Sequence, residues 1–77
     1  MQVKYDESVN ALYVYFTDEP VARTERAGEH ANVDYDSENR VVGIEILDPT
    51  DGVNLDGLPR SEDIGRILTL LRFPVFA

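Results

Sequence analysis

The strongest constraint on this sequence is a period-two alternation of side chains through its first two thirds. In residues 11–17 (ALYVYFT), aliphatic and phenylalanine side chains alternate with two tyrosines. Residues 31–36 and 41–46 repeat the alternation with other apolar residues. Successive side chains of a β-strand point to opposite faces, so this pattern predicts strands and not helices. We therefore expect a sheet over residues 2–47, with the segment 11–17 in an interior position or covered on both faces.

Turn and edge features divide this sheet into strands. Residues 21–26 are charged on both faces, which is typical of an edge strand. Asn39 lies in a polar turn and is expected to adopt a left-handed backbone conformation. Gly43 leaves a gap in the last strand, and we expect a large neighbour such as Tyr13 or Tyr15 to occupy it.

A helical pattern follows the predicted sheet. Residues 48–60 hold two prolines, two glycines and several aspartates or asparagines, and are expected to be a linker. Ser61 is the expected N-cap of a helix over residues 61–72, and residues 73–77 form an apolar tail. The helix carries one apolar stripe at i, i+3, i+4 and i+7, made of Ile64, Ile67, Leu68 and Leu71. We therefore predict one α+β domain over residues 1–77, an antiparallel β-meander of four to five strands followed by one C-terminal amphipathic helix.

Composition restricts the partners and the chemistry. Fifteen acidic residues against seven basic ones give a net charge of −8, which disfavours nucleic-acid backbones and anionic membranes. The same charge keeps a small domain soluble and would steer a basic protein partner towards it. The absence of cysteine excludes disulfides, thiolate catalysis and zinc–sulfur sites. We expect no cofactor, no membrane span and no signal peptide, and therefore a cytoplasmic protein.

Few residues are candidates for chemistry. His30, the single histidine, lies in a turn-like stretch and is expected to be a solvated turn residue and not a catalytic base. Asp34, Asp36 and Glu38 are spaced by two and are weak candidates for a divalent metal site. In a strand, however, the two aspartates share one face, so a solvated acidic row is the favoured interpretation. No catalytic residue is predicted.

Apolar residues at the C-terminal end exceed what one helix stripe needs. They are candidates for an interface: Leu70, Leu71, Phe73, Val75 and Phe76. Either the tail folds back on the sheet, or it meets a second subunit, since exposed apolar patches mark contacts. We favour a homodimer.

Two stretches resemble a known family. They are VKYDESVNALYVYF (residues 3–16) and NVDYDSENRVVGIEILD (residues 32–48). They are similar to the bacterial family of small proteins catalogued as domain of unknown function 2283, and the resemblance covers residues 2–48. Family members commonly carry Asp where this chain has Asn10 and Gly where it has Asn39. The resemblance implies a compact sheet-plus-helix domain with no assigned catalytic residues.

The resemblance also bears on function. Some family members are encoded beside small proteins that look like ribonuclease toxins, which implies an antitoxin-like role. Our first hypothesis is accordingly a non-enzymatic protein-interaction domain, homodimeric and binding a small basic partner. The alternative is a small metal- or ligand-binding protein, or an enzyme, that uses the acidic strand edge.

Overall fold

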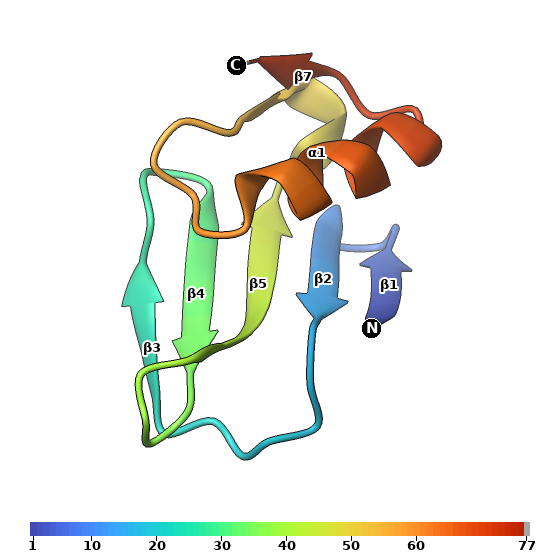
Figure 1. Cartoon of the computed structure of the whole chain (residues 1–77). Helices are drawn as coiled ribbons and strands as arrows, with labels where there is room; N and C mark the ends of the chain where they lie inside the picture. Colours follow the sequence, from blue (N-terminus) through green and yellow to red (C-terminus); the bar gives the residue numbers. More distant parts are fainter. Residues whose placement is uncertain (77) are drawn as a thin grey trace.

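Residues 1–76 are described by the computed structural model, and within them five strands form an antiparallel sheet with a helix across one face (Figure 1). The strands are β1 (Gln2–Asp6), β2 (Ala11–Tyr15), β3 (Arg23–Arg26), β4 (Ala31–Tyr35) and β5 (Val41–Leu47). After the sheet come the 3-10 turn η1 (Pro49–Asp51), β6 (Val53–Asn54), α1 (Ser61–Leu70) and β7 (Val75–Phe76). The predicted α+β fold with a C-terminal helix is confirmed.

The strand order is β1-β2-β5-β4-β3, so the strands are not all neighbours in chain order as in a simple meander. β1 and β2 form one hairpin, β3 to β5 form two more, and β2 pairs with β5 in the middle. The connection from β2 to β3 runs along one end of the sheet to its far edge (Figure 1). β3 therefore lies at an edge, as its charged sequence predicts, and β1 lies at the other.

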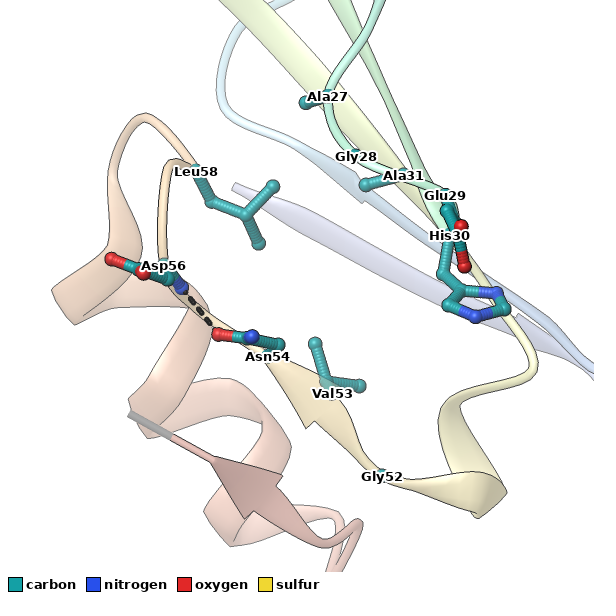
Figure 2. Close-up of a pocket in the computed structure, with 10 residues that line it drawn as sticks. All are labelled: Ala27, Gly28, Glu29, His30, Ala31, Gly52, Val53, Asn54, Asp56 and Leu58. Carbon is teal, nitrogen blue, oxygen red and sulfur yellow. Dashed lines mark hydrogen bonds between the residues drawn. The ribbon is translucent and has the colours of Figure 1, made fainter.

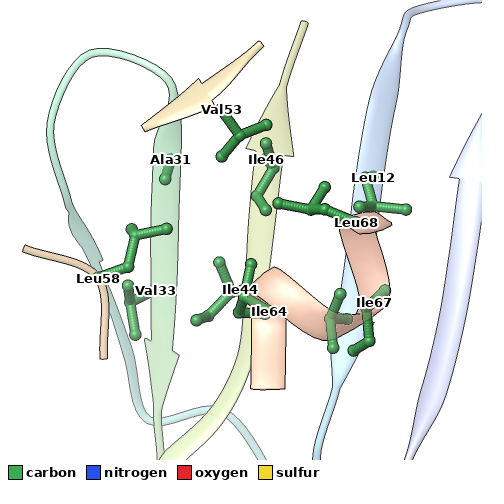
Figure 3. Close-up of a cluster of buried hydrophobic side chains, with 11 residues drawn as sticks. Leu12, Ala31, Val33, Ile44, Ile46, Val53, Leu58, Ile64, Ile67 and Leu68 are labelled. Carbon is green, nitrogen blue, oxygen red and sulfur yellow. The ribbon is translucent and has the colours of Figure 1, made fainter. Parts of the chain in front are cut away.

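The core lies between the sheet and α1. Strand residues that face the helix alternate with outward ones, and those with at most 6 % exposure are Leu12, Val14, Ala31, Val33, Ile44 and Ile46. The helix contributes Ile64, Ile67 and Leu68 to the same cluster (Figure 3). The segment predicted to be a plain linker also takes part, because Val53 and Leu58 pack into the cluster. Burying each large side chain contributes about 1.5–3 kcal/mol, so this cluster fixes the helix on the sheet.

The N-terminus of α1 differs from the prediction. Arg60 is the N-cap residue, with a left-handed φ of 57°, and Ser61 is the first helical residue without a side-chain cap. The Arg60 Nε donates a hydrogen bond of 2.7 Å to Asp63 Oδ2, and its guanidinium lies 4.0 Å from the Phe16 ring centroid. The contact with Phe16 outside the helix and the contact with Asp63 in its first turn hold Arg60 at the cap position, so the prediction of Ser61 as the cap was wrong.

The C-terminus of α1 is a Schellman turn, which ends the helix two residues earlier than predicted. Arg72 has φ 65°, its N–H donates to the Thr69 carbonyl, and the Phe73 N–H donates to the Leu68 carbonyl. Leu71 is consequently the C-cap and is 45 % exposed. It does not belong to the buried stripe to which its spacing assigned it.

Two backbone expectations are confirmed at special positions. Asn39 has φ 65°, in the left-handed region. A Cβ atom on Gly43 would lie 2.8 Å from the Val14 carbonyl oxygen and 3.0 Å from Tyr15 Cδ1. Tyr15 thus fills the gap that the glycine leaves, and a larger residue would collide with the neighbouring strand.

The period-two alternation of side chains is interrupted where the pairing register of β4 and β5 shifts, between Asp34 and Tyr35. Val42 is only 2 % exposed, but it lies outside the core cluster that holds Ile44 and Ile46. It lines a hollow with Tyr15 and residues of the connection that follows β2. Strict alternation over residues 41–46 would place Val42 on the same face as the two isoleucines, and the structure does not.

Candidate functional site

A small hollow lies between the β3–β4 turn and β6 (Figure 2). Its volume is about 240 Å³, below the roughly 300–1,000 Å³ that is usual for small-molecule sites. Ala31, Val53 and Leu58 supply apolar side chains, and Asn54 and Asp56 supply polar groups. The Asp56 N–H donates to Asn54 Oδ1 at 2.9 Å, so part of that polarity stabilises the loop itself.

His30 lies at this hollow but is not held as a catalytic base. Its backbone carbonyl accepts a hydrogen bond of 2.7 Å from the Leu47 N–H, which ties the turn to the end of β5. Its side chain is exposed, and within residues 1–76 it forms no hydrogen bond or ion pair that would orient the ring. General-base catalysis requires such an orienting partner. His30 thus has the environment of a turn residue.

The three acidic metal candidates are each engaged with protein groups. Asp34 Oδ1 accepts a hydrogen bond of 2.6 Å from Thr24 Oγ1, and Glu38 pairs with Arg40 at 2.9 Å. Asp36 is only 4 % exposed, so the predicted solvent-facing row does not include it. No group of three metal-ligating side chains occurs in residues 1–76.

Asp36 holds the β4–β5 turn together. One carboxylate oxygen accepts the backbone N–H groups of Glu38 and Arg40 at 2.8 and 2.9 Å, and the other accepts Arg40 Nε at 2.9 Å. The Arg40 N–H and guanidinium and the Glu38 N–H hold the pKa of the Asp36 carboxyl below its ordinary value. From its spacing, Asp36 was predicted to belong to a solvent-exposed acidic row. Spacing alone does not reveal that its carboxylate caps the β4–β5 turn.

The face of the sheet opposite the helix carries a polar group that the sequence analysis missed. Asn32 Nδ2 donates to Glu45 Oε1 at 3.0 Å, and Glu45 is the cross-strand partner of Tyr13. Hydrogen bonding to Glu45 raises the pKa of Tyr13. Tyr13 and Tyr15 lie with nearly parallel rings, 6.3 Å between centroids. The group spans three neighbouring strands, and only the strand pairing brings its members together.

Exposed apolar side chains occur on the edge strand β1 and at the C-terminal end of α1. We call them the edge patch, which consists of Val3, Tyr5, Leu70 and Leu71, with exposures of 40, 36, 80 and 45 %. The Tyr5 and Phe73 rings meet edge to face at 5.1 Å between centroids, which ties β1 to the segment that follows α1. The edge patch therefore joins residues far apart in the sequence.

The predicted interface residues divide between this patch and the fold itself. Leu70 and Leu71 belong to the edge patch, whereas Phe73 and Val75 pack against the core cluster. β7 pairs in parallel with β6, so the end of the tail folds back on the segment before α1, while Phe73 contacts Tyr5 of the large sheet. Phe76 is 57 % exposed, and its ring covers the position where Gly52 has no Cβ. Ala77 lies outside the described residues.

Comparison with known proteins identifies a family but no characterised relative. The sequence profile described as protein of unknown function (DUF2283) matches residues 2–48, which span β1 to β5. No curated protein and no solved structure matches the chain. Among residues 1–76, no helix has the length and hydrophobicity needed to cross a bilayer.

Proposed function

The chain belongs to the DUF2283 family, and we propose that it acts as a non-enzymatic protein-interaction domain. The edge patch carries this proposal, since its four apolar side chains are exposed and two of them, Val3 and Tyr5, lie on an open strand edge. Tyr5 also contacts Phe73, which closely follows Leu70 and Leu71 in the chain. Exposed apolar groups of this kind mark protein contacts. The hollow at His30 and the acidic residues of the β4–β5 turn offer no comparable arrangement for catalysis or metal binding.

The proposed contact has two parts. The edge patch joins two copies of the chain into a homodimer, and the acidic surface attracts a small basic protein. The net charge of −8 supports the second part, because complementary charge accelerates association with a basic partner. The family resemblance adds the antitoxin-like form of this role, exerted in the bacterial cytoplasm.

Oligomeric state tests the first part. We expect light scattering and sedimentation to give the mass of a dimer for the unaltered chain. Leu71→Asp should give a folded monomer, since it puts a charge into the edge patch. Val21→Asp is the matched control, because Val21 is 49 % exposed but lies in the β2–β3 connection. If the Leu71→Asp variant is still a dimer, the edge patch is not part of the dimer contact.

Co-purification tests the second part. The tagged chain, isolated from a bacterial host at low salt, should retain a basic protein in stoichiometric amount and lose it as salt rises, because the attraction is screened. A monomer at all concentrations, together with no salt-sensitive partner, would overturn the proposed function.

A further inference from the structure

We propose that the two copies pair through their β1 strands, antiparallel, about a two-fold axis at Tyr5, so that one sheet continues across the dimer. This inference rests on the proposed function and specifies the geometry of its homodimer. A two-fold axis brings the same patch of each copy together, as isologous contacts require.

The backbone of β1 has free hydrogen-bonding groups on its outer side. The Phe16 N–H donates to Val42 O, and the Asp48 N–H donates to Asn10 O, so even-numbered residues of β2 bond to β5. The direction of the backbone hydrogen bonds alternates from residue to residue along an antiparallel strand. The backbone N–H and C=O groups of Tyr13 and Tyr15 therefore point towards β1. Their partners Lys4 and Gln2 therefore bond to β2. It follows that the N–H and C=O groups of Val3 and Tyr5 point to the open edge, where an unpaired strand is a template for another.

Charge selects the register. With the axis at Tyr5, each Lys4 lies opposite Asp6 of the second copy, which gives two complementary pairs. An axis at Lys4 would place the two lysines directly opposite each other, and like charges in that position are unfavourable. An axis at Val3 would place Lys4 opposite Gln2, without a complementary charge. The register at Tyr5 is thus the one that the charges of β1 favour.

Apolar groups flank the same axis on the helix side of the sheet. Tyr5 and Val3 pair with the core residues Leu12 and Val14 of β2, so they share the face that α1 covers. The register at Tyr5 places the two Tyr5 side chains opposite each other, and cross-strand aromatic pairs are stabilising. Phe73 meets Tyr5 edge to face, and the exposed Leu70 and Leu71 just before it would add apolar area from each copy.

The other sheet edge is protected against such pairing. β3 has the sequence RTER and is exposed along its whole length. Arg23 forms an ion pair of 2.8 Å with Glu25, and Arg26 Nε donates to the Gly28 carbonyl at 3.1 Å. Charged side chains along an edge disfavour strand addition. The contrast between the two edges directs pairing to β1.

Cysteine cross-linking maps the register, because the natural chain has no cysteine that could interfere. Variants Q2C, K4C and D6C would be oxidised mildly, alone and as mixed pairs, after circular dichroism has shown that each is folded. We expect a disulfide dimer from the mixture of K4C and D6C, and none from K4C alone. A cross-link from K4C alone would place the axis at Lys4, and one from Q2C with K4C would place it at Val3. Either result would overturn the proposed register.

Charge reversal provides a second measurement that leaves Asp6 and its turn intact. Lys4→Glu turns both complementary pairs into repulsive ones and should raise the dimer dissociation constant about tenfold or more. Gln2→Glu is the matched control and should leave it unchanged, because residue 2 lies beyond the paired segment in this register. A dimer that is insensitive to Lys4→Glu would refute the β1 pairing and leave the interaction function standing. A chain that never dimerises would refute both the pairing and the homodimer.

Discussion

Two leucines of α1, two positions apart, should differ sharply in what they contribute to stability. Leu68 is 0 % exposed and packs between helix and sheet, whereas Leu70 is 80 % exposed. Leu68→Ala removes about three methylene equivalents from the core, at about 0.8 kcal/mol each. The cavity left behind adds to this, so we expect a loss of about 3–4 kcal/mol in the free energy of unfolding.

That loss is large for a domain of this size. A chain of 77 residues has a total stability of about 4–12 kcal/mol. Leu68→Ala should therefore lower the melting temperature by about 12–32 °C, at about 4–8 °C per kcal/mol. Leu70→Ala should change the unfolding free energy by less than about 0.5 kcal/mol, as expected of an exposed position.

Urea unfolding followed by circular dichroism measures both values. The titrations belong at protein concentrations low enough for the monomer to predominate, because dimerisation would add apparent stability. Repeating them at high concentration should reveal a penalty for Leu70→Ala, since Leu70 is in the edge patch. Equal losses for the two variants at low concentration would refute the assignment of the buried helix face. A loss below about 1 kcal/mol for Leu68→Ala would refute the packing of α1 on the sheet.

Two further predictions concern the backbone and acid stability. Arg72 holds a left-handed φ of 65° at the end of α1, so Arg72→Gly should stabilise the chain by about 0.5–1 kcal/mol, measured by urea unfolding, and no gain would contradict the Schellman turn. Asp36→Asn should lower the melting temperature at neutral pH. The folded-state pKa of Asp36 lies below its ordinary 3.8, so its contribution is present above about pH 4 and is lost as the pH falls towards the folded-state value. The difference between Asp36→Asn and the unaltered chain should shrink in melting curves near pH 2.5, and a constant difference would contradict this role.

Period-two alternation was sufficient to predict the strands and most of the core. It identified the inward face of β2 and β5, because a regular strand cannot place Leu12 or Ile44 elsewhere without exposing them. It failed at Val42, where the register between β4 and β5 shifts, and at Asp36, which caps the turn that follows β4. A shift of one residue exchanges the two faces, and no local pattern in the sequence marks it. The metal hypothesis required the Asp36 side chain to be available beside Asp34 and Glu38, whereas it is buried in the turn.

Features set by distant contacts were beyond local reasoning. Ser61 has the intrinsic preference of a cap, but Arg60 takes the cap position, where the distant Phe16 packs against its guanidinium. The strand order and the network of Asn32, Glu45 and Tyr13 depend on pairing between segments far apart in the chain. The edge patch was predicted only in part, since its two leucines were among the predicted interface residues and Val3 and Tyr5 were not.

The match to the family ends at residue 48, yet the fold cannot end there. A sheet of residues 2–48 alone would expose Leu12, Val14, Ile44 and Ile46, which are at most 2 % exposed under α1. The helix is therefore part of the same cooperative unit, whatever sequence supplies it. The edge patch follows the same division, with Val3 and Tyr5 inside the matched segment and Leu70 and Leu71 outside it. The β1 edge thus belongs to the part that the family profile describes, and the leucines of the proposed contact come from the segment beyond it.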